Sequence, residues 1–188
     1  MNAAPDYPPI SVIMSVLNEA RHLDSAVQHI LGQDYPGQLE VVVALGPSHD
    51  ETDQVAARLA AAEPRVKLVP NPSGITPKGL NAALAATSYE IVARVDGHAV
   101  IPADYLRIGV DTLRTTGADN VGGIMWAEGT TPFECAVARA MTSPLGVGNA
   151  RFHTGGQAGP ADTVYLGVFR RAALDRLGGY DESFLRAQ

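Results

Sequence analysis

The chain has 188 residues, of which 46% are hydrophobic and 18% are charged, a composition typical of a soluble globular protein. Its formal net charge of -6 argues against nucleic acid as a partner, because duplex binding needs a basic surface. One cysteine, Cys135, excludes an internal disulfide and favours a reducing, cytoplasmic location. We expect its side chain to be buried in a helix. The N-terminus has no signal-peptide pattern, and peripheral membrane association stays open.

Strands and helices are expected to alternate along the chain. Runs that are apolar or β-branched throughout predict buried strands at 10–17, 39–45, 66–69, 90–95, 120–126 and 162–169. Helical patterns are found near 23–31, 55–59, 76–86, 102–113 and 170–177, and a further helix is expected to begin at 132. Repeated strand–helix units predict a mainly parallel sheet with helices on both faces, a Rossmann-like α/β/α sandwich. The length fits a single domain, 1–188.

Helix starts are marked by two Thr-Pro pairs. Thr76 is expected to cap a helix with Pro77 at its first position, where proline loses no hydrogen bond. The sequence from Thr131 to Glu134 predicts a capping box, in which each residue's side chain bonds the other's backbone N–H.

A long Gly-rich stretch, 143–161, has no hydrophobic period. Loops of this length in a compact domain are usually functional lids or disordered segments. Arg151 and His153 are therefore candidates for acceptor contact or lid closure, with a disordered loop as the alternative. Trp126 follows an apolar run, and we expect it in the core rather than as a sugar platform.

Polar residues follow three of the expected strands: Asn18-Glu19, Ser48 and Asp96-Gly97-His98. Ligands bind outside the carboxyl ends of the strands in open α/β sheets, so these groups are expected to converge on one crevice. Each has a simpler reading. Asn18-Glu19 fits a helix N-terminus, the loop before the second helix fits a structural cap, and Asp-Gly is a common hairpin turn.

Several enzyme classes lose support because their motifs are absent from the sequence. No G-x-G-x-x-G follows the first strand, and no Walker A sequence is present, which disfavours dinucleotide-dependent oxidoreductases and P-loop phosphotransferases. No G-x-S-x-G elbow appears, which counts against an α/β-hydrolase.

Four segments carry a pattern that extends over roughly residues 10 to 188. "SVIMSVLNEA" ends the first strand in Asn-Glu, and "GPSHDETD" contains Ser-x-Asp-x-Thr. "RVDGHAVIPADYL" places Asp-x-His before Pro-x-x-Tyr-Leu, and "LGGYDESF" comes near the end. Together these segments resemble the family 2 glycosyltransferases, which are inverting enzymes of the GT-A fold.

The resemblance implies transfer of a sugar from a nucleoside diphosphate sugar to a hydroxyl of a saccharide or lipid-linked acceptor. The diphosphate leaving group develops negative charge, which a divalent cation, Mn2+ or Mg2+, stabilises as a Lewis acid. By the resemblance, Asp96 and His98 hold this metal, with His98 in the place of a second aspartate. A histidine ligand predicts metal binding that weakens as the imidazole is protonated.

The resemblance also assigns a nucleotide-sugar pocket. Its positions in this sequence are Ser15, Leu17, Asn18, Glu19, Leu45, Asp96 and Gly97. Lys78 is added as a candidate for a phosphate contact, with a solvated lysine as the alternative. Ser15 and Leu17 stand where the family often has Pro and Tyr, so stacking of a tyrosine on the base is lost. Leu45-Gly46 stand where many members have Asp-Asp, so the carboxylate that usually bonds the base is missing.

The end of the chain departs from the family. The family's general base lies in an acidic pair a few residues beyond the segment that "GGYDESF" resembles, whereas Asp181 and Glu182 match a non-catalytic turn. We therefore expect a truncated enzyme, impaired in transfer, with its catalytic residue unknown. The alternatives are a non-catalytic nucleotide-sugar-binding fragment and a sugar nucleotidyltransferase. The latter needs a Gly-rich basic N-terminal loop that "SVLNEARHL" lacks.

Overall fold

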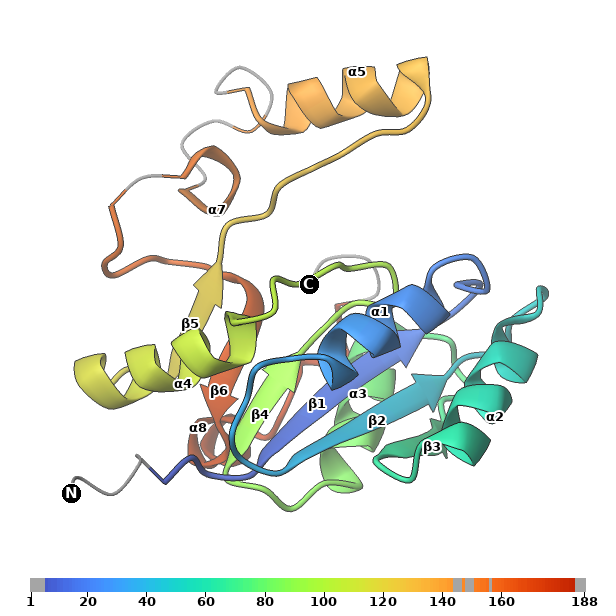
Figure 1. The fold of residues 1–188 in the computed structure, drawn as a ribbon, viewed down its shortest axis with the longest axis horizontal. Coiled ribbons are helices and arrows are strands. Elements are labelled where there is room, and N and C mark those ends of the chain that lie inside the picture. The colour runs from blue at the N-terminus through green and yellow to red at the C-terminus, as the bar shows by residue number, and fades with distance from the viewer. Residues whose placement is uncertain (1–5, 144–146, 148–150, 156, 185–188) are drawn as a thin grey trace.

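A computed structural model describes residues 6–143, 147, 151–155 and 157–184 and confirms the alternation of strands and helices (Figure 1). The strands are β1 (Ile10–Val16), β2 (Leu39–Leu45), β3 (Val66–Pro70), β4 (Ile91–Arg94), β5 (Asn120–Gly123) and β6 (Tyr165–Arg170). The helices are α1 (Leu23–Leu31), α2 (Thr52–Ala62), α3 (Thr76–Ala85), α4 (Tyr105–Thr116), α5 (Pro132–Met141), α7 (Arg151–Thr154) and α8 (Arg171–Leu177). Among the described residues, no helix combines the length and apolar character needed to cross a bilayer.

The six strands form one sheet in the order β3-β2-β1-β4-β6-β5. β2 pairs parallel with β1 and β3, and β4 pairs parallel with β1, whereas β6 is antiparallel to both of its neighbours. The sheet is therefore mainly parallel, as predicted. Chain order runs outward in opposite directions from β1, through β2 on one side and β4 on the other. This makes the β1–β4 boundary a topological switch point, where ligands bind in such sheets.

Helices cover both faces of the sheet, so the predicted three-layer α/β/α sandwich is confirmed (Figure 1). Alternate residues of β1 point to opposite faces: Val12 and Met14 pack in one buried cluster with α1, α2 and α4, and Ile13 packs in the other with α3 and α8. All three of these side chains are fully buried. Burial on both faces explains why the strand is an unbroken apolar run apart from its serines.

The two predicted helix starts have different outcomes. α3 has Ile75 at its N-cap, so Thr76 is its first helical residue rather than its cap, and Pro77 follows one position later. The proline still lies in the first turn, where its missing N–H costs nothing. In α5 the predicted capping box is confirmed, with the Glu134 N–H donating to Thr131 Oγ1 at 3.2 Å.

The segment containing α5 and α7 extends away from the sheet and its flanking helices (Figure 1). No residue of α5 is buried, Cys135 is exposed, and Trp126 is 77% exposed. The expectations of a buried Cys135 and a core Trp126 are therefore wrong. β5 is an edge strand that ends at Gly123, so the chain leaves the sheet before it reaches Trp126. Within 143–161, α7 forms one helical turn, while the Arg151 side chain lies outside the described residues.

Candidate functional site

A crevice lies at the carboxyl ends of β1 and β4, as the strand rule predicts. It encloses about 280 Å3 and is lined by Ser15, Leu17, Glu19, Gly74, Thr76, Asp96, Gly97 and His98. Six of these residues belong to the site expected from sequence. Two lining residues were missed by sequence reasoning: Gly74, from the loop before α3, and Thr76, the first residue of α3. The positive φ of Gly74, 66°, shows why a glycine stands there.

Three of the expected site residues lie beside this cavity rather than in its lining. Asn18 turns its side chain toward the neighbouring loop, where its Oδ1 accepts the His49 N–H at 2.8 Å. Leu45 is the last residue of β2, one strand farther from β4. Lys78 is exposed in the first turn of α3.

The loop from Ser48 to Thr52 holds the chain that leaves β1. The Asn18 N–H donates to Ser48 Oγ at 3.0 Å, and the Glu19 N–H donates to Thr52 Oγ1 at 2.8 Å. Asn18 is in the left-handed region, with φ of 58°, which asparagine tolerates better than most residues. Since α1 begins only at Leu23, the reading of Asn18 as a helix cap is wrong. These bonds hold the backbone of Asn18 and Glu19 against the loop that follows β2.

Asp50 organises the same loop. Its Oδ1 accepts the Thr52 N–H at 3.0 Å and the Thr52 hydroxyl, and its Oδ2 accepts the Ala20 N–H at 3.1 Å. The hydrogen bond from the Thr52 hydroxyl, with smaller contributions from backbone N–H groups, lowers the pKa of Asp50. This supports the structural reading of the loop before α2.

Replacing Thr52 with valine should raise the pKa of Asp50 toward its ordinary value, because the largest stabilisation of its carboxylate is lost. A depressed carboxyl pKa contributes stability above the unfolded-state pKa, and that stability is lost as pH falls through the folded-state value. The variant should therefore be less stable than the wild type at neutral pH, and the difference should shrink as pH falls through the folded-state pKa of Asp50. Carboxyl 13C NMR titration of both proteins measures the shift, and an unmoved Asp50 titration would contradict the assignment.

Gly97 allows a close contact between the ends of β1 and β4. A Cβ at this position would lie 2.9 Å from Val16 Cγ1 and 3.1 Å from Glu19 Cγ. Glu19 therefore packs directly over Gly97, and its Oε1 lies 2.8 Å from His98 Nδ1. Asp96-Gly97 is thus part of the crevice wall, and β4 makes no hairpin there, because the next strand, β5, begins only at Asn120.

Asp96 is held by an arginine that sequence reasoning missed. Arg94, at the end of β4, donates from Nε and Nη2 to Asp96 Oδ1 at 3.1 and 2.9 Å. The arginine and aspartate side chains are only 17% and 25% exposed. Both of these hydrogen bonds end on the same carboxylate oxygen, Oδ1. Spacing of two residues along a strand puts such a pair on one face, which is a signal that the sequence offered.

The start of α3 packs closely on β1 beneath the crevice. A Cβ on Gly79 would lie 2.2 Å from Ser15 Oγ and 2.6 Å from Asn71 Nδ2. Asn71 in turn donates to the Ile75 carbonyl at 3.2 Å, at the N-cap of α3. The glycine therefore lets the helix approach the strand that carries Ser15 and Leu17.

The turn that contains Asp181 and Glu182 is fixed to α3 by Asn81. The Asn81 side chain accepts the Tyr180 N–H at 2.8 Å and donates to the Tyr180 carbonyl and to Glu182 Oε1, both at 2.9 Å. Asp181 accepts the Ser183 N–H at 2.9 Å. Tyr180 packs inward, and burial raises its pKa to about 12. Both acidic side chains are therefore engaged in holding the turn.

Asp96 and His98 form a donor set at the crevice that would suit a divalent cation. Among the described residues, no group of three or more His, Cys, Asp or Glu side chains could hold a metal by itself. Asp96 and His98 provide one carboxylate and one imidazole from the same turn after β4. Magnesium prefers oxygen ligands and keeps several waters, so an imidazole in the pair favours a transition-metal ion over magnesium. Two protein ligands would leave coordination positions open for phosphate oxygens, so Asp96 and His98 fit a divalent cation.

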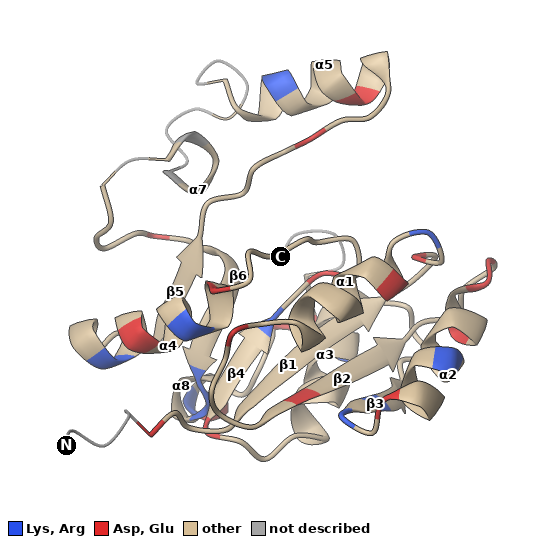
Figure 2. Cartoon of the chain, in the orientation of Figure 1, with Lys and Arg blue, Asp and Glu red and all other residues tan. Residues whose placement is uncertain are grey.

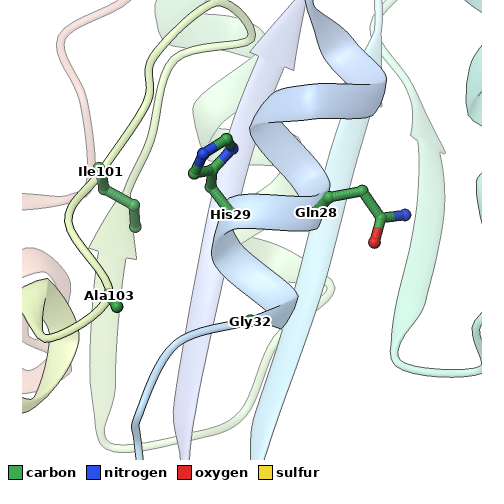
Figure 3. Close-up of a pocket in the computed structure, with 5 residues that line it drawn as sticks. All are labelled: Gln28, His29, Gly32, Ile101 and Ala103. Atoms are coloured by element: carbon green, nitrogen blue, oxygen red, sulfur yellow. The ribbon is translucent and has the colours of Figure 1, made fainter.

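A second cavity, of about 290 Å3, lies between α1 and the segment before α4 (Figure 3). It is lined by Gln28, His29, Gly32, Ile101 and Ala103. The His29 ring points toward Ile101, whereas Gln28 points away (Figure 3). His29 Nδ1 lies 2.7 Å from the Ser25 carbonyl. The lining contains no carboxylate, lysine or arginine, so it offers no site for a metal-bound diphosphate.

Charged residues are distributed over many elements, with Lys and Arg interspersed among Asp and Glu rather than gathered on one helix or strand (Figure 2). Beside the crevice both signs come together where Arg94 contacts Asp96. Ligand binding in the crevice would therefore depend on individual side chains rather than on a large surface of one charge.

The chain is similar in sequence to known proteins. The model of "Glycosyl transferase family 2" matches residues 11–178. The chain is 34% identical over 175 residues to the succinoglycan biosynthesis protein ExoA of Rhizobium meliloti, covering 92% of this chain and 53% of that protein. It is 30% identical over 118 residues to glycosyltransferase AglE of Haloferax volcanii, covering 62% and 39% respectively.

Solved structures show the same fold. The mannosyltransferase PcManGT from Pyrobaculum calidifontis, in complex with GDP-Man and Mn2+, superposes with a TM-score of 0.69 at 27% identity. That match covers 96% of this chain and 50% of the mannosyltransferase. The fold is therefore the GT-A fold, and the chain belongs to glycosyltransferase family 2. It spans about half the length of the relatives to which it is similar.

Proposed function

We propose that the protein transfers a sugar from a nucleoside diphosphate sugar to an acceptor hydroxyl, with inversion at the anomeric carbon. The observation that carries the proposal is the convergence of Asp96, His98 and Glu19 with Ser15 and Leu17 in one crevice at the switch point of the sheet. Family membership and the GDP-Man bound to the mannosyltransferase of the same fold support a nucleotide-sugar donor.

A divalent cation, when bound, would neutralise the charge that develops on the diphosphate leaving group. We propose Asp96 and His98 as its protein ligands and Mn2+ as the preferred ion. The Mn2+ of the mannosyltransferase complex supports this choice, as does the imidazole in the ligand set. Arg94 keeps the Asp96 carboxylate in one orientation through two hydrogen bonds, so the ligand is preorganised.

The nucleoside pocket is proposed to lie beside Leu17, Leu45 and Gly46. Gly46 packs against Leu17, since a Cβ there would lie 3.1 Å from Leu17 Cδ1. Because no side-chain carboxylate stands at Leu45 or Gly46, the base would be bound by apolar contacts and backbone groups. Lys78, exposed in the first turn of α3, is proposed to contact a phosphate.

The acceptor is proposed to be a saccharide, free or lipid-linked, by similarity to the succinoglycan biosynthesis protein. A lipid-linked acceptor would bring the protein to the inner face of a membrane. Removing the proton of the acceptor hydroxyl requires a general base, usually a carboxylate or histidine. We assign none, because the side chains of Asp181 and Glu182 are engaged in holding their turn.

Isothermal titration of GDP and UDP, each with and without Mn2+, tests the proposal. We expect one nucleoside diphosphate to bind in the presence of the cation and much more weakly without it. ADP serves as the control for adventitious binding of a diphosphate to the metal. Failure of both GDP and UDP to bind above the level of ADP would contradict a role in sugar transfer.

A further inference from the structure

His98 and Glu19 form a pair across the crevice whose members differ in environment. Glu19 follows β1 and His98 follows β4, and Glu19 Oε1 lies 2.8 Å from His98 Nδ1. The Glu19 side chain is 20% exposed, whereas that of His98 is 58% exposed. A largely sheltered carboxylate is thus committed to one nitrogen of an exposed imidazole.

Glu19 is fixed in place by contacts that do not involve His98. Its N–H donates to Thr52 Oγ1 at 2.8 Å, and the following N–H, of Ala20, donates to Asp50 Oδ2 at 3.1 Å. Its Cγ packs over Gly97, where a Cβ would approach to 3.1 Å. The loop before α2 and the glycine in the turn after β4 therefore hold Glu19 in position beside His98.

This contact determines which imidazole nitrogen carries the proton. An ionised carboxylate only accepts hydrogen bonds, so Nδ1 must be the donor in the pair. In the neutral ring, Nε2 is then left with a lone pair. Metal-binding histidines commonly have their second nitrogen bonded to a carboxylate, which fixes the tautomer and raises the basicity of the ligating nitrogen.

We propose that Glu19 is the positioning residue of His98: it fixes the Nδ1–H tautomer and orients the ring so that Nε2 binds the divalent cation. The inference rests on the proposed function, because it concerns the same cation. In this proposal Glu19 orients His98 and does not bind the nucleotide directly. A purely electrostatic role for the Glu19 charge is the competing explanation.

Two substitutions separate orientation from charge. Glu19→Ala removes both the charge and the hydrogen-bond acceptor, while Glu19→Gln removes the charge but keeps an amide oxygen that accepts from Nδ1–H. Titration of Mn2+ by electron paramagnetic resonance, with GDP or UDP present, measures the dissociation constant. We expect about a 10–100-fold weaker affinity for Glu19→Ala, the usual cost of losing such a partner. Glu19→Gln should recover most of this loss. Glu90→Gln, at an exposed position at the other end of β4, should match the wild type.

The second readout requires no metal. Imidazole 15N spectra, with His98 identified by its loss in His98→Gln, report the tautomer directly. The Nδ1–H form should dominate in the wild type and in Glu19→Gln and should give way to the Nε2–H form in Glu19→Ala. An equal loss of affinity in both Glu19 variants, or an unchanged tautomer in Glu19→Ala, would overturn the inference. Absence of Mn2+–nucleotide binding by the wild type would instead overturn the proposed function, whatever the tautomer shows.

Discussion

Replacing Asp96 with asparagine should weaken cation-dependent nucleotide binding by at least about 100-fold. Losing a partner that only orients a metal ligand already lowers metal affinity by about 10–100-fold. Asp96 is the single carboxylate in the proposed ligand pair, so its loss should lower the affinity further. Asparagine has nearly the same size and keeps an oxygen that accepts from Arg94, so the partly buried guanidinium is not left without its partner. The change therefore tests the charge of the ligand rather than the integrity of the crevice.

Calorimetric titration of the cation in the presence of the preferred nucleoside diphosphate measures this effect. Urea denaturation of the same variant should give a free energy of unfolding close to that of the wild type, which separates binding from folding. Glu90→Gln, at the residue just before β4, is the control for loss of one acidic charge away from the crevice. Retention of affinity within a few-fold in Asp96→Asn would show that the cation binds at other residues.

Replacing Gly79 with valine should lower the free energy of unfolding by about 3 kcal/mol, at the upper end of the usual cost of overpacking. A Cβ at Gly79 alone would lie 2.2 Å from Ser15 Oγ and 2.9 Å from Ser15 Cβ. Valine is a better helix former than glycine by only about 0.5 kcal/mol, so the clash outweighs the gain in propensity. Either α3 or β1 must move, and both contribute residues to the crevice.

Gly159 provides the matched control for this substitution. A Cβ there would have no heavy atom within 4 Å, so Gly159→Val should change the free energy of unfolding by no more than about 0.5 kcal/mol. Urea denaturation of the two variants and the wild type makes the comparison. Equal stability of Gly79→Val and the wild type would contradict the close packing of α3 on β1.

The layered fold could be predicted because its core consists of local patterns repeated along the chain. β1 and β2 are short apolar runs between turn residues, and such runs are typical of strands buried on both faces. The positions of Asp96 and Glu19 at one edge then follow from the strand rule alone. The antiparallel direction of β6 could not be predicted in this way, since its apolar sequence fits either direction.

Exposure in the segment around α5 could not be predicted from its sequence. The apolar run before Trp126 and the pattern around Cys135 resemble those of buried elements, yet both residues are exposed. Periodicity indicates which residues share a face but not whether another element packs on that face. β5 lies at the edge of the sheet, and the chain that follows it, which includes Trp126 and Cys135, extends away from the core.

The partners of the site residues also depended on contacts distant in sequence. Arg94 lies two residues from Asp96, and that pairing was readable from the sequence. The contact of Glu19 with His98 joins residues 79 positions apart, and it requires the turn at Gly97 to come close to the end of β1. Such contacts depend on tertiary distances that no local spacing contains.

Asp96 and His98 are proposed to form the cation and diphosphate site of a sugar-transferring enzyme. A crystal of the protein grown with Mn2+ and its preferred nucleoside diphosphate, measured at the manganese absorption edge, tests this most directly. We expect an anomalous peak within coordination distance of Asp96 and of His98 Nε2, with the diphosphate bound to the same ion. A manganese ion bound elsewhere, or a nucleotide seated in the cavity beside His29, would contradict it.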